Sequence, residues 1–63
     1  MNGYYPLVIE KLKAAGYWYL RQGKGAHECW TNGQRNQLVS FNIDSRHTAN
    51  GIMKQAGINH KFA

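Results

Sequence analysis

A short length and the lack of an internal disulfide limit the folds that this chain can adopt. It has 63 residues and one cysteine, Cys29, so no two cysteines can pair. A domain of this size has a single core that contributes only a few kcal/mol to stability. Its length leaves no room for a second domain or a nucleotide-binding α/β unit. Hydrophobic residues, at 43%, and aromatic residues, at 13%, are too frequent for a disordered chain. We therefore expect one domain spanning residues 1–63.

The charge of the chain suggests its class of partner. Eight Lys and Arg residues stand against three Asp and Glu, which gives a net charge of +5. Such a surface attracts polyanions, of which nucleic acid is the commonest in a cytosol, although charge can also serve solubility alone. A lone cysteine is typical of a reducing compartment, the N-terminus lacks a signal-peptide pattern, and no apolar run approaches the ~20 residues of a membrane span. We expect a cytoplasmic protein that binds nucleic acid and no membrane.

Two segments have the apolar spacing of amphipathic helices. The first covers residues 5–15, where apolar residues recur at i, i+4 and i+7 starting from Val8. The second covers residues 49–56, with Thr48 as the expected N-cap. Residues 59–63 after it are predicted to form a tail.

Three segments between these helices are predicted to be strands: residues 17–22, 26–31 and 36–43. A glycine-rich turn separates the first two, and Asn32-Gly33, a pair that tolerates positive φ, separates the second and third. The order helix, three antiparallel strands, helix predicts an α+β domain. Because each helix has a single apolar stripe, both helices should cover one face of the sheet and leave the other open. This layout is that of double-stranded RNA-binding domains.

Three stretches of the chain resemble the HicA toxins of HicA–HicB toxin–antitoxin systems. They are LKAAGY at residues 12–17, RQGKGAHE at residues 21–28 and SRHTANGIMKQAGI at residues 45–58. The resemblance implies the toxin component of a type II system, a ribosome-independent endoribonuclease that cleaves mRNA. It also implies a HicB antitoxin as the partner that binds the toxin and blocks its active site. The family's glycine-serine-histidine step maps onto Gly25-Ala26-His27, so alanine stands where serine is usual.

The resemblance makes His27 the candidate catalytic residue. RNA cleavage requires that a proton leave the 2′-hydroxyl and that another reach the departing 5′-oxygen. A histidine, with an ordinary pKa of ~6.5, can do either at neutral pH. Lys24 beside it, Arg21, and Arg46 near the start of the second helix are candidate phosphate contacts. Arg35 and Lys54 are further candidates, and solvated surface charges are an equal alternative for these two. His47 is either a second histidine at the same phosphate or a solvated loop residue.

Other chemistry finds little support in the sequence. Glu10, Glu28 and Asp44 are too widely spaced for a magnesium nuclease site, and no residues stand at zinc spacing, so we expect no metal and no cofactor. Strand alternation directs Glu28 to the face opposite His27, where it could bind an arginine, and puts Cys29 on the same face as His27.

The aromatic residues leave two further functions open. Trp18, Tyr19 and Trp30 could stack on RNA bases, although packing in a small core is expected for most of these rings. Alternation places Trp18 on one face and Tyr19 on the other without deciding which face is open. The alternatives to a nuclease are an RNA-binding module without catalysis and a protein-interaction domain that uses an open aromatic sheet face.

Overall fold

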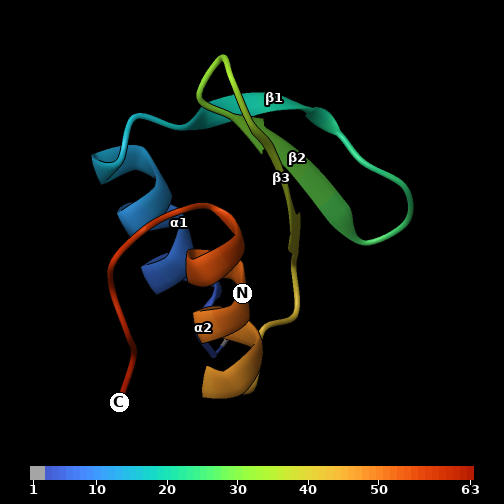
Figure 1. The fold of residues 1–63 in the computed structure, drawn as a ribbon. Coiled ribbons are helices and arrows are strands. Elements are labelled where there is room, and N and C mark those ends of the chain that lie inside the picture. The colour runs from blue at the N-terminus through green and yellow to red at the C-terminus, as the bar shows by residue number, and fades with distance from the viewer. Residues whose placement is uncertain (1–2) are drawn as a thin grey trace.

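The computed structural model of the protein describes residues 3–63 and confirms the predicted α-β-β-β-α order. Both helices lie on one side of the sheet, and the other side is open (Figure 1). The elements are α1 (Tyr5–Ala14), β1 (Trp18–Gln22), β2 (His27–Thr31), β3 (Asn36–Ser40) and α2 (Arg46–Gln55).

The sheet is antiparallel with the order β1-β2-β3, so β2 is its central strand. Trp30 of β2 lies opposite Tyr19 on one side and Gln37 on the other. The register of β1 shifts between Tyr19 and Arg21, which makes Leu20 the extra residue of a β-bulge. We call the side of the sheet that carries Trp30 the inner face, because Trp30 belongs to the core that the helices complete.

The opposite side of the sheet, here called the outer face, carries the alternate residues of β2: His27, Cys29 and Thr31. The predicted placement of Cys29 on the same face as His27 is therefore confirmed. Cys29 is buried although no helix covers it, because Arg21 and Leu38 lie opposite it on the flanking strands. On the outer face, the small side chains of Cys29 and Thr31 thus lie between larger ones on the two edge strands.

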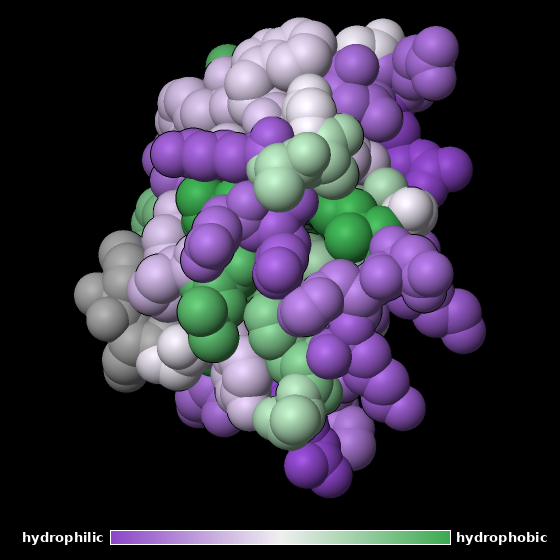
Figure 2. All heavy atoms as spheres, turned by 90° about the vertical axis from the view of Figure 1, so that its left-hand side faces the viewer, coloured by the Kyte–Doolittle hydropathy of each residue, from purple (hydrophilic) through white to green (hydrophobic). Residues whose placement is uncertain are grey.

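The core lies between the inner face and the helices. Its largest fully buried side chains come from both helices, from β3 and from the segment after β3, and they are Leu12, Ile43, Met53, Val8 and Val39. On the helical side of the molecule, hydrophilic side chains separate the hydrophobic ones that reach the surface (Figure 2). None of the helices within residues 3–63 is long and apolar enough to cross a membrane.

Helix α2 begins earlier than predicted. Its N-cap is Ser45, whose side chain accepts a hydrogen bond of 3.1 Å from the backbone N–H of His47. The predicted N-cap, Thr48, instead lies within the helix and is exposed. As a result, Arg46 and His47 are the first two residues of α2 rather than part of a loop.

The third strand and the chain end also differ from the prediction. Strand β3 ends at Ser40, whose hydroxyl accepts a hydrogen bond of 3.1 Å from the N–H of Asn42, and the chain turns away from β2 there. Ile43 forms an isolated bridge with Gly3 instead. Residues 59–63 contain no helix or strand, as expected of a tail, but Phe62 is buried in the core.

Candidate functional site

His27 is the first residue of β2, and its side chain is exposed. Its Nδ1 lies 3.1 Å from the backbone oxygen of Lys24. A carbonyl oxygen can only accept a hydrogen bond, so Nδ1 carries the proton in this contact, and Nε2 of the neutral ring is then unprotonated. The backbone of the loop therefore selects the tautomer in which Nε2 can accept a proton.

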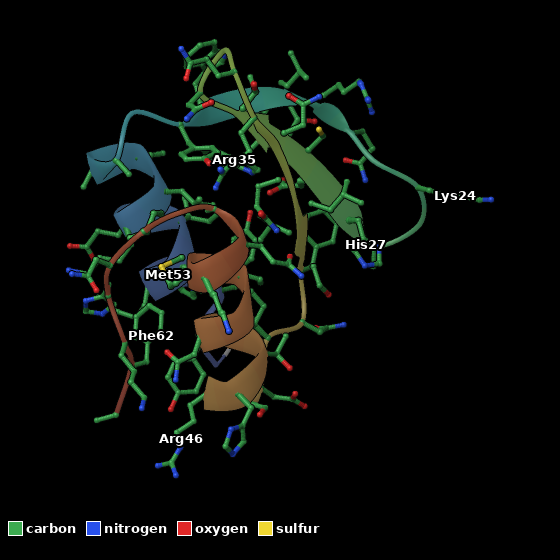
Figure 3. All side chains as sticks on the ribbon, viewed as in Figure 1. Lys24, His27, Arg35, Arg46, Met53 and Phe62 are labelled. Atoms are coloured by element: carbon green, nitrogen blue, oxygen red, sulfur yellow. The ribbon has the colours of Figure 1, made fainter. Side chains whose placement is uncertain are left out.

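The loop that supplies this contact joins β1 to β2 and covers residues 23–26. Gln22 closes it from the strand side, because its Nε2 donates to the backbone oxygens of Gly25, at 3.3 Å, and His27, at 3.0 Å. Gly25 has a φ of 64°, in the left-handed region that favours glycine. Figure 3 shows Lys24 on this loop and His27 where the loop returns to the sheet.

Two candidate phosphate contacts lie near His27. Lys24 is exposed in the loop, three positions before His27. Arg21 is exposed on the outer face, opposite Cys29, which is the next outer-face residue of β2 after His27. The hairpin of β1 and β2 thus carries two cations and one imidazole in a single exposed region.

Two other candidates, Arg46 and His47, lie elsewhere. Arg46 and His47 are exposed at the start of α2, where they line a surface hollow of about 430 Å³ with Asn50, Lys61 and Phe62. In Figure 3, Arg46 lies at the far end of α2 from the hairpin that carries Lys24 and His27. The structure therefore does not bring His47 to the same site as His27.

Glu28 takes a different partner from the one expected. Its Oε1 accepts hydrogen bonds from the hydroxyl of Tyr5, at 2.6 Å, and from Nε1 of Trp30, at 3.1 Å. The hydrogen-bond partners of Glu28 are thus a tyrosine and a tryptophan rather than the possible arginine, because the inner face brings Tyr5 of α1 next to it. Burial, and then the hydrogen bond to Glu28, raise the pKa of Tyr5 from 10.0 to about 12.

The aromatic residues divide between the core and the surface. Tyr17 and Trp30 are buried, and the Tyr17 hydroxyl donates to the backbone oxygen of Ala56 at 2.8 Å. Tyr19 is 47% exposed and packs edge-on against Trp30 on the inner face. Trp18 is 51% exposed and lies opposite Thr31, which places it on the outer face with His27.

Arg35, a candidate phosphate contact from its charge, has a structural role in the fold. Its Nη1 donates to the backbone oxygen of Gln55 at 3.0 Å, at the C-terminal end of α2. A cation is favourable there because the last carbonyl groups of a helix are unpaired. No local signal in the sequence indicates this contact, since the two residues are 20 positions apart.

Residues 3–63 contain no group of three His, Cys, Asp or Glu side chains placed to hold a metal ion together. No family model matches the chain, and neither the curated proteins nor the solved structures that were searched include a match. The residues of the hairpin and their geometry are therefore the observations that bear on function.

Proposed function

We propose that this protein is a HicA-like toxin, a ribosome-independent endoribonuclease that cleaves mRNA with His27 as its general acid or base. The observation that carries the proposal is the exposed imidazole of His27, whose Nδ1 contacts the Lys24 carbonyl at 3.1 Å. This contact leaves Nε2 unprotonated and directed away from its backbone partner. The confirmed α-β-β-β-α fold agrees with the resemblance to HicA toxins.

In the proposed reaction, Nε2 of His27 takes the proton of a 2′-hydroxyl. The 2′-oxygen then forms a bond to the adjacent phosphorus, and the bond from phosphorus to the 5′-oxygen breaks. The departing 5′-oxygen takes a proton from water, and the resulting hydroxide takes the proton from Nε2, which restores the neutral ring. The other product ends in a 2′,3′-cyclic phosphate. General base catalysis of this kind typically contributes 10²–10⁴-fold to the rate. Lys24 and Arg21 would offset the phosphate charge.

The same proposal includes a protein inhibitor. A HicB-type antitoxin would neutralise the toxin by covering the hairpin that carries Lys24 and His27, and its complementary surface would present acidic or hydrogen-bonding groups. Electrostatic matching of this kind makes association fast and sensitive to salt. Because Arg46 lies at the end of α2 that is far from the hairpin, an antitoxin that covers only the hairpin would leave Arg46 free. Both proteins would act in the cytoplasm.

Induced expression in a bacterium tests the proposal. The wild-type chain should arrest growth and deplete mRNA, whereas His27→Ala should restore growth. His47→Ala is the matched control, since it removes an exposed histidine away from the hairpin, and it should remain toxic. With purified protein, His27→Ala should lower the cleavage rate about 10²–10⁴-fold. Cleavage by the wild type should persist in EDTA and leave 2′,3′-cyclic or 3′-phosphate ends.

Four outcomes would contradict the proposal. A folded His27→Ala protein that cleaves RNA as fast as the wild type would remove His27 from the mechanism. Loss of activity in EDTA with recovery in Mg²⁺ would indicate a metal-dependent nuclease. Salt-dependent RNA binding by the wild type without any product would favour the RNA-binding module, and no RNA binding at all would favour a protein-interaction domain.

A further inference from the structure

The outer face of the sheet exposes large apolar side chains that no element of the fold covers. Trp18, Leu20 and Leu38 are 51%, 44% and 57% exposed. Within residues 3–63, no acidic residue lies on this face: Glu28 points to the inner face, Glu10 belongs to α1, and Asp44 lies between β3 and α2. The face therefore combines exposed apolar side chains with the positive charge of Arg21 and the neighbouring Lys24.

The register of the sheet places Trp18, Arg21 and the candidate catalytic residue His27 in a spatial order along the outer face. Trp18 lies opposite Thr31, Arg21 lies opposite Cys29, and His27 begins β2. Thr31 is four residues from His27, which corresponds to about 13 Å along a strand. An aromatic ring, a guanidinium group and an imidazole thus follow one another along the same face.

The ring of Trp18 also has a defined support. A Cβ atom built on Gly33 would lie 3.5 Å from Cη2 of Trp18, so the ring reaches the turn between β2 and β3. Half of the side chain nevertheless remains open to solvent. A ring that is supported by the fold and exposed in this way loses little freedom when a flat partner stacks on it.

From this arrangement we infer that the outer face binds an unpaired segment of RNA, with one base stacked on Trp18 and a phosphate at Arg21, and leads the chain to His27. Aromatic stacking requires an unstacked base, which a single strand offers and a duplex does not. Stacking is also tolerant of sequence, because every base has a π-face. The inference names the form of RNA that the proposed nuclease takes, and it rests on that proposal only for the cleavage step.

Binding of an unstructured RNA oligonucleotide with 2′-O-methyl groups tests the inference. This probe cannot be cleaved through its 2′-oxygens, so the measurement does not depend on the chemistry at His27. Trp18→Ala should weaken binding about 5- to 100-fold, and Trp18→Phe should retain most of the affinity. Tyr19→Ala is the matched control, because Tyr19 is adjacent and similarly exposed but lies on the inner face. Its affinity should equal that of the wild type.

Two further measurements distinguish stacking from simple charge attraction. Arg21→Ala should reduce the slope of log K against log salt by about 0.7, the value for one phosphate contact on a single strand. A duplex of the same sequence should compete poorly with the single strand. Thermal denaturation of each variant shows that it is folded before its affinity is compared.

Several results would overturn the inference. One is equal affinity of the folded Trp18→Ala variant and the wild type for the probe, which is expected if the outer face serves a protein partner. The others are preferential binding of the duplex and no binding of the probe at all. Normal cleavage of mRNA combined with Trp18-independent binding would overturn this inference and leave the proposed function intact. Trp18-dependent binding of RNA without any cleavage would support this inference and overturn the proposed nuclease function.

Discussion

At the scale of single residues, His27 and Glu28 show how strand alternation separates a surface role from a structural one. They are neighbours in the sequence, but His27 is exposed on the outer face and Glu28 accepts hydrogen bonds from Tyr5 and Trp30 on the inner face. The contact with Tyr5 ties α1 to the strand on which His27 stands. Removing it should affect folding rather than the chemistry at His27.

Tyr5→Phe should lower the free energy of unfolding by about 1–3 kcal/mol at neutral pH, because Glu28 loses one of its two donors. It should also change the response to alkali. The pKa of Tyr5, about 12 in the folded protein, exceeds the ordinary value of 10.0, so its stabilising contribution is complete below pH 10 and is lost as pH rises towards 12.

Urea denaturation between pH 7 and pH 12 measures both effects. Tyr4→Phe is the control, since the Tyr4 hydroxyl makes an exposed contact of 3.3 Å with the backbone oxygen of Ala63. The wild type and Tyr4→Phe should lose stability more steeply above pH 10 than Tyr5→Phe does. Parallel curves for wild type and Tyr5→Phe would show that the contact with Glu28 does not hold the proton on Tyr5.

At the scale of elements, side-chain hydrogen bonds in turns and at helix ends decide where the helices and strands begin and end. The turn predicted at Asn32-Gly33 is present, but of residues 3–63 only glycines have positive φ, so Asn32 does not act through that conformation. Its Oδ1 instead accepts hydrogen bonds from the N–H groups of Gln34, at 2.9 Å, and Arg35, at 2.7 Å. Asparagine thus favours this hairpin by mimicking a backbone turn.

The start of α2 gives a direct comparison of two capping candidates. Ser45→Ala should lower the free energy of unfolding by about 1 kcal/mol, because its side chain accepts the hydrogen bond from the N–H of His47. Thr48→Ala should leave stability unchanged or raise it by about 0.5 kcal/mol, since alanine is the better residue at an exposed helix position. Denaturation curves of the two variants measure the difference. A larger loss for Thr48→Ala would restore Thr48 as the N-cap.

At the scale of the whole molecule, the chain end completes the core. Phe62 is 8% exposed, and its ring centroid lies 5.5 Å from that of Tyr4. Asn50 of α2 holds the backbone of Phe62 at both polar atoms, accepting from its N–H at 2.6 Å and donating to its oxygen at 3.2 Å. A segment without regular structure is therefore connected to the core by both packing and hydrogen bonds.

Phe62→Ala should lower the free energy of unfolding by about 3 kcal/mol, the usual cost of removing a buried aromatic ring. For a domain whose core contributes only a few kcal/mol, this loss should leave a large unfolded fraction. Lys61→Ala, at the exposed neighbouring position, should change stability by less than about 0.5 kcal/mol. Thermal denaturation followed by circular dichroism compares them. Equal stability of the two variants would mean that the chain end is dispensable to the core.

Local sequence signals were enough to predict the order of the elements, because apolar periodicity, Gly25 and the Asn32-Gly33 turn act over a few residues. They also placed His27 and Cys29 on one face and Glu28 on the other, since alternation along a strand is local. Tertiary structure decided which face the helices cover, and therefore that Trp18 is open to solvent while Trp30 is buried. It also separated Arg46 from the hairpin and buried Phe62, because such placements depend on contacts between residues far apart in the chain.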